Sequence, residues 1–206
     1  MQLIGMLDSP YVRRAAISGL MMGLVFEHRS ISVFRHIDAF RAINPLVKAP
    51  TLVCEDKDII VDSQLILDYF ESLVAPEKRL MPIELASRKR ALHVIGVALV
   101  ACEKTVQHLY ETQLRPPERQ HAPWIDRVKN QLEDAWKLLE PIAAKASPWL
   151  AGERLTQADI TLAVAWRFNQ FSQPGLSNAA HYPSIAALSM CAEALSEFMA
   201  YPVDKE

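Results

Sequence analysis

Cysteine and glycine are both scarce in this chain, and the patterns that each would supply are missing. The 206 residues contain only three cysteines, at positions 54, 102 and 191, and no CxxC motif. Isolated cysteines of odd number argue against a disulfide framework or a thiolate metal site, and they favour a reducing compartment. The six glycines form no GxGxxG, P-loop or GxSxG motif, which excludes the usual nucleotide-cradling loops and the serine-hydrolase elbow. The six histidines show no metal-ligand spacing, so we expect no metal.

An excess of one charge and long apolar runs are also absent. The 22 lysines and arginines nearly balance the 24 acidic residues, for a net charge of −2, which gives no electrostatic reason to expect nucleic acid or an anionic membrane as partner. Two short basic clusters, Arg13-Arg14 and Arg88-Lys89-Arg90, fall in helical patterns and are expected on solvated faces. The apolar stretch 91–102 is too short to span a bilayer, and the amino-terminal residues do not resemble a signal peptide. We therefore expect a cytoplasmic protein.

The hydrophobic pattern divides the chain into two domains. Within residues 1–75, short apolar runs alternate with helical spacing in the order β-α-β-α-β-β-α, and the first crossover should make the first two strands parallel. Residues 76–86 contain two prolines and no periodicity, which predicts a linker. Residues 87–206 are helical in pattern, so the fold class is an α/β amino-terminal domain followed by an all-α domain.

Three sequence features predict where helices of this domain begin, bend or end. Residues 84–114 read as one long or bent helix, and Pro141 should kink or end the next helix, over 122–146. Thr156 and Asp159 have the spacing of a capping box at the start of an apolar helix, which should be buried.

A serine before a proline begins the first predicted helix. Proline is favoured at the first helical position, so Ser9 should be the N-cap, where it accepts a backbone N–H bond worth about 1 kcal/mol. The same geometry can serve an anion, because helix N-termini attract a thiolate and a hydroxyl donor lowers a thiol pKa from its ordinary value of about 8.5. The local sequence leaves both roles open.

Two further segments could serve a ligand in the same half of the chain. Pro50 directly precedes a strand, where a cis peptide would turn a backbone group of Ala49 outward, although spacing alone does not indicate the cis form. Asp62 and Ser63 begin the last helix of this half, so that Ser63 offers a carboxylate-binding end and Asp62 a charge for an ammonium. An amino acid presents such a pair, and an ordinary N-cap with an exposed acid is the alternative.

Five segments resemble a known family in order and spacing. They are SPYVRR at 9–14, NPLVKAPTL at 44–52, DS at 62–63, RLMP at 79–82 and LTQADITLA at 155–163. Over essentially the whole chain, the sequence resembles bacterial cytosolic glutathione S-transferases with a serine-type site. The resemblance implies a thioredoxin-like amino-terminal domain, a helical carboxy-terminal domain, a cis proline, glutathione as co-substrate and usually a homodimer.

Residue roles follow from the resemblance by position. Ser9 would activate the glutathione thiol. Ala49 would pair its backbone with the cysteinyl part of glutathione, and Pro50 would be the cis residue. Asp62 and Ser63 would hold the γ-glutamyl amine and carboxylate.

The remaining candidates concern the rest of glutathione and the second substrate. Lys48 is a further candidate, for the glycyl carboxylate, and Val47 stands where the family often has glycine. The second-substrate pocket is expected between the first helix and helix 84–114, with walls from Leu7, Tyr11, Val106 and Tyr110.

The resulting hypothesis is a glutathione transferase that acts in detoxification on an electrophilic, apolar second substrate. Two alternatives stay open: a catalytically silent binding or regulatory protein of the same fold, and a glutathione-dependent peroxidase.

Overall fold

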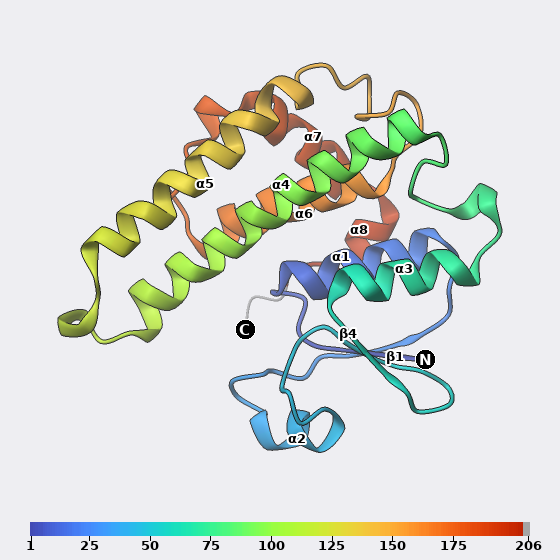
Figure 1. Cartoon of the computed structure of the whole chain (residues 1–206), viewed down its shortest axis with the longest axis horizontal. Helices are drawn as coiled ribbons and strands as arrows, with labels where there is room; N and C mark the ends of the chain where they lie inside the picture. Colours follow the sequence, from blue (N-terminus) through green and yellow to red (C-terminus); the bar gives the residue numbers. More distant parts are fainter. Residues whose placement is uncertain (204–206) are drawn as a thin grey trace. The chain divides into compact units, whose positions relative to one another are not determined.

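The computed structural model describes residues 1–203 and shows two compact units (Figure 1). The first unit contains residues 1–80 and the chain from Ala194 onward, and the second contains Met81–Glu193. The unit boundary lies inside the predicted linker 76–86. Within the described residues, no helix is both long and apolar enough to cross a membrane.

A four-stranded mixed sheet forms the centre of the first unit. Its strand order is β2-β1-β3-β4, with β1 (Gln2–Ile4) parallel to β2 (Glu27–Arg29) and antiparallel to β3 (Thr51–Val53), which forms a hairpin with β4 (Ile59–Val61). The parallel first crossover and the hairpin are as predicted. Each strand is three residues long.

Three helices complete this sheet domain in the predicted order. Helix α1 (Pro10–Met21) and helix α3 (Ser63–Leu73) lie side by side on one face of the sheet, and α2 (Ile37–Ile43) lies on the other (Figure 1). The βαβαββα order confirms the thioredoxin-like fold class. Apolar side chains from both layers, including Leu3, Ile17 and Phe70, are fully buried between them.

The end of the chain returns to the first unit, which differs from the predicted division at 87–206. Helix α8 (Ser196–Ala200) packs on α1, where Arg13 Nε donates to the Tyr201 carbonyl at 2.8 Å and the Arg13 guanidinium lies 5.7 Å from the centre of the Phe198 ring. The expectation that Arg13-Arg14 lies on a solvated face is wrong, because each arginine is only 1% exposed. Both side chains bind other parts of the unit instead of water.

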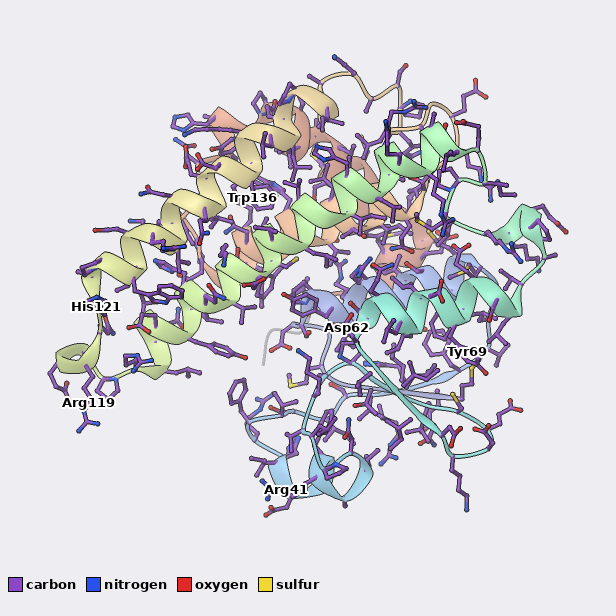
Figure 2. All side chains as sticks on the ribbon, viewed as in Figure 1. Arg41, Asp62, Tyr69, Arg119, His121 and Trp136 are labelled. Atoms are coloured by element: carbon purple, nitrogen blue, oxygen red, sulfur yellow. The ribbon has the colours of Figure 1, made fainter. Side chains whose placement is uncertain are left out.

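The second unit is all helical. Its elements are α4 (Leu85–Leu109) with a π-helical turn (Tyr110–Leu114), α5 (Ala122–Ala143), α6 (Gln157–Ser172) and α7 (Pro183–Glu193), joined in part by 3-10 turns at Pro117–Arg119 and Ala179–His181. Helix α5 passes through Pro141 and ends two residues later, at Ala143. Trp136 of α5 is fully buried in this unit (Figure 2) and packs edge-to-face on Trp166 of α6, with ring centres 5.1 Å apart.

The predicted capping box at the start of α6 is present. One Asp159 carboxylate oxygen accepts from the N–H and the hydroxyl of Thr156 at 2.8 and 2.7 Å, and the other accepts from the Leu150 N–H at 2.8 Å. Burial raises the pKa of Asp159, and these three bonds oppose that increase by stabilising the carboxylate.

Gly5 allows a close approach at the end of β1. Its φ of +138° lies in a region that favours glycine, and a Cβ there would stand 2.6 Å from Val12 Cγ2 and 3.1 Å from Ala49 Cβ. Glycine at position 5 is therefore required for the end of β1 to lie this close to both Val12 of α1 and Ala49.

We expect Gly5→Ala to lower the free energy of unfolding by about 3 kcal/mol, because it combines a strained φ with overpacking. Chemical denaturation measures this change. Gly96→Ala is the matched control: Gly96 lies inside α4 with open space around it, so the same added methyl should raise stability by about 0.5–1 kcal/mol. A Gly5→Ala variant as stable as the wild type would contradict the assigned close packing.

Candidate active site

Ser9 is the N-cap of α1, as its position before Pro10 predicts. Its backbone is extended, with φ −73° and ψ 120°, and its Oγ accepts from the Val12 N–H at 3.4 Å. A hydroxyl has two acceptor sites and one donor hydrogen, so this cap contact leaves the Ser9 hydrogen available to a ligand. Ser9 therefore caps α1, and its geometry also allows it to donate a hydrogen bond to a bound anion.

The peptide bond between Ala49 and Pro50 is cis, as the resemblance implies. It precedes β3 and follows a tight loop that Asn44 organises. Asn44 Nδ2 donates to Thr51 Oγ1 at 2.8 Å, and Asn44 Oδ1 accepts from the Leu46 N–H at 3.0 Å. Asn44 is buried, so this loop is fixed from within the domain and presents Ala49 next to Gly5. Sequence reasoning missed both Asn44 and Gly5.

Val47 adopts a conformation that glycine normally takes. Its φ is +49°, in the left-handed region, and its N–H donates to the Asn44 carbonyl at 3.0 Å. The loop therefore keeps the turn that a glycine would make, with a β-branched residue in it at a cost of about 1–2 kcal/mol. Two residues on, the half-buried Ala49 begins the cis peptide.

Asp62 and Ser63 form the start of α3 (Figure 2). The exposed Asp62 is the N-cap, with φ +73°, and its Oδ1 accepts from the Gln64 N–H at 2.8 Å. Within the described chain, the Ser63 N–H has no protein acceptor. This end of the helix thus offers a free N–H and a hydroxyl to an anion, and the exposed Asp62 carboxylate adds a negative charge that attracts a cation.

Arg14 binds the start of α3, although the sequence pattern placed it on a solvated face. Arg14 Nη1 donates to Ser63 Oγ at 3.1 Å, and Nη2 donates to Gln64 Oε1 at 3.4 Å. Because Ser63 Oγ accepts from Arg14, the Ser63 hydroxyl hydrogen is directed elsewhere. The guanidinium also adds a buried positive charge to the positive end of the α3 dipole. Helical spacing alone does not show that Arg14 is buried. Its burial follows from the polar partners that α3 provides next to α1.

The other predicted site residues fall in both units. Lys48 is exposed in the loop before the cis peptide, and Leu7 and Tyr11 flank Ser9-Pro10 in the first unit. Val106 and Tyr110 belong to α4 and the π-helical turn of the second unit, where Tyr110 is exposed. A second-substrate pocket with these walls stays a prediction.

The Cys54 thiol, directly after β3, is shifted toward its protonated form. Burial raises its pKa, as do the nearby carboxylates of Asp56 and Asp58, although a hydrogen bond with Tyr69 opposes the shift. Among residues 1–203, no three histidine, cysteine or acidic side chains form a group that could hold a metal ion.

Two solved structures of bacterial glutathione transferases are similar to this chain over nearly its whole length. A glutathione S-transferase from Methylobacterium radiotolerans, in complex with glutathione sulfonate, is 25% identical, with a TM-score of 0.91 over 100% of this chain and 96% of that chain. A glutathione transferase family member from Pseudomonas fluorescens Pf-5, with bound glutathione, is 26% identical, with a TM-score of 0.85 over 98% of each chain.

Sequence comparisons agree with the structural ones. An Escherichia coli K12 protein described as the uncharacterized GST-like protein YibF is 28% identical over 141 residues, which are 68% of each chain. The family model for the glutathione S-transferase N-terminal domain matches residues 3–78, and the model for its C-terminal domain matches residues 107–191. Two family models in order, on the two units that the structure shows, establish that the chain belongs to the bacterial glutathione S-transferase family.

Proposed function

We propose that this protein is a glutathione transferase that binds glutathione in its first unit and activates the thiol through Ser9. The second substrate is an electrophilic, apolar molecule. By the same resemblance, the protein acts in the cytoplasm as a homodimer, and its role is detoxification.

The observation that carries the proposal is that three features able to bind a ligand lie at the first turns of α1. Ser9 caps that helix, and the cis-peptide loop packs against Gly5, four residues earlier. Arg14, five residues later, ties the start of α3 to the same helix. A thiol, a backbone amide and an α-amino acid end are the three parts of glutathione that such features would bind.

The chemistry assigned to each feature follows from its donors and charges. Asp62 accepts from the γ-glutamyl ammonium, and Ser63 donates its N–H and hydroxyl to the γ-glutamyl carboxylate. The backbone of Ala49 pairs with the cysteinyl amide, and Lys48 attracts the glycyl carboxylate. With the ligand fixed at these points, its sulfur lies at the mouth of α1, where the Ser9 hydroxyl donates to the thiolate.

The reaction needs only a stabilised thiolate in the correct place. The thiol proton passes to water, the sulfur lone pair forms a bond to the electrophilic carbon, and the leaving group departs with its bonding electrons. The Ser9 hydrogen bond stabilises the thiolate, and lowering the thiol pKa increases the fraction that can react at neutral pH.

We expect Ser9→Ala to raise the pKa of enzyme-bound glutathione by about 1–2 units, because a charge-assisted hydrogen bond is worth about 1.5–3 kcal/mol. Ultraviolet titration of the thiolate measures this pKa. The rate of conjugation to 1-chloro-2,4-dinitrobenzene should fall about tenfold or more near pH 6.5, and should approach that of the wild type at alkaline pH, where both thiols are ionised.

Ser9→Thr is the matched control, since it keeps the hydroxyl and the cap and should keep the low thiol pKa. Unchanged thiolate formation in Ser9→Ala would show that Ser9 only caps α1. Loss of that cap alone should lower the free energy of unfolding by about 1 kcal/mol. If millimolar glutathione gave the wild type neither calorimetric heat nor thermal stabilisation, the silent binding protein would replace the transferase.

A second prediction concerns Arg14 as a positioning residue. Lysine keeps the charge but loses the planar pair of donors, so Arg14→Lys should release Ser63 and Gln64 and raise the KM for glutathione about tenfold, with kcat at saturation nearly unchanged. Steady-state kinetics measure both constants.

Arg13→Lys provides the comparison on the same helix. Arg13 is equally buried but binds the Tyr201 and Phe198 carbonyls, so its substitution should reduce stability without changing the KM for glutathione. Equal KM values for the two variants would mean that Arg14 serves folding alone.

A further inference from the structure

The second unit contains a cavity of about 680 Å³ that the proposed glutathione site does not use. It lies among the first turns of α4, the end of α5 and the segment that leads into α6, all within Met81–Glu193. Its volume is within the range of small-molecule sites, about 300–1,000 Å³.

Four basic side chains line this cavity, and no acidic side chain does. They are Lys89, Arg90, His93 and Lys145. Lys89 and His93 are four residues apart and so share one face of α4, and Lys145 comes from the end of α5. Within residues 1–203, none of the four pairs with a carboxylate; Arg90 instead donates to Ser87 Oγ at 2.8 Å. The Glu84 carboxylate lies outside the lining and interacts electrostatically with Arg90, so the cavity keeps an excess of positive charge, which is complementary to an anion.

Four backbone N–H groups near the cavity already have acceptors. The Glu84 carboxylate accepts from the Ala86 and Ser87 N–H groups at 2.7 Å each, at the start of α4. At the start of α6, the carboxylate of Asp159 accepts from Leu150 and Thr156. These four N–H groups are therefore not available to an anion in this cavity, whereas the basic side chains are.

The rest of the lining is mainly apolar. Ala91 and Val94 of α4 are buried and present methyl groups to the cavity, and Ile142 of α5 and Ala158 of α6 extend this surface. A free inorganic ion would leave these groups in contact with water, whereas an organic body would cover them. The lining thus fits a ligand with a charged head and an apolar part.

We propose that this cavity binds an organic phosphate monoester with an aromatic or aliphatic body. Lys89, Arg90 and Lys145 bring three positive charges to the cavity, which matches the phosphate charge of about −1.5 to −2 better than a single carboxylate. Lysines bind phosphate as point charges, and arginine presents paired donors to its oxygens. This proposal does not depend on the proposed function, because none of these residues belongs to the glutathione site.

The test is calorimetric titration of the full-length protein with phenyl phosphate, benzoate, phenol and inorganic phosphate. We expect phenyl phosphate to bind at least tenfold more tightly than each of the other three, because only it has both a doubly charged head and an apolar body. Equal binding of benzoate would overturn the assignment to a phosphate. Equal binding of inorganic phosphate would overturn the role of the apolar lining.

Paired substitutions locate the binding. Lys89→Gln with Lys145→Gln should weaken phenyl phosphate binding at least tenfold. The matched control is Lys129→Gln with Lys137→Gln, which removes two charges from α5 outside the cavity and should leave the affinity within twofold. Equal loss in both double variants, or no binding of phenyl phosphate to the wild type, would contradict the proposal. Phenyl phosphate should not compete with glutathione, and competition would place it in the other site.

Discussion

The buried guanidinium of Arg14 holds together the parts of the first unit on which the proposed chemistry depends. Ser9 and Ser63 begin different helices, separated in the chain by α2 and three strands. Arg14 donates from α1 to Ser63 and Gln64 of α3, so the start of α3 is fixed beside α1 by hydrogen bonds and not by apolar packing alone. Burying such a charge is costly, which explains why its donors bind polar partners within the unit.

The helix starts in this protein differ in the strength of their caps. At α4 and α6, a carboxylate takes two or three donors at 2.7–2.8 Å, and these helices carry no proposed glutathione contact. The cap of α1 is a single contact of 3.4 Å from a serine hydroxyl, and at α3 the Ser63 N–H stays open. A carboxylate therefore caps α3 as well as α4 and α6, whereas α1 has only the longer serine contact, which leaves the Ser9 hydroxyl hydrogen for a ligand.

Local patterns were enough to predict some of this arrangement, and tertiary contacts explain the rest. Proline at the first helical position predicted Ser9 as a cap. The alternation of short apolar runs with helical spacing predicted the βαβαββα order. The burial of Arg13 and Arg14 could not be read in this way, because a polar pair within a helix ordinarily faces water. The return of α8 depends on a bond between Arg13 and Tyr201, 188 residues apart, and no local signal carries it. The need for glycine at position 5 likewise arises only from its contacts with Val12 and Ala49.

The most direct measurement of the central claim is a crystal structure of the protein with glutathione bound. The account predicts the glutathione sulfur within hydrogen-bond distance of Ser9 Oγ, the cysteinyl amide on the backbone of Ala49, and the γ-glutamyl end on Asp62 and Ser63. Glutathione bound with its sulfur away from Ser9, or with its γ-glutamyl carboxylate away from the start of α3, would contradict it.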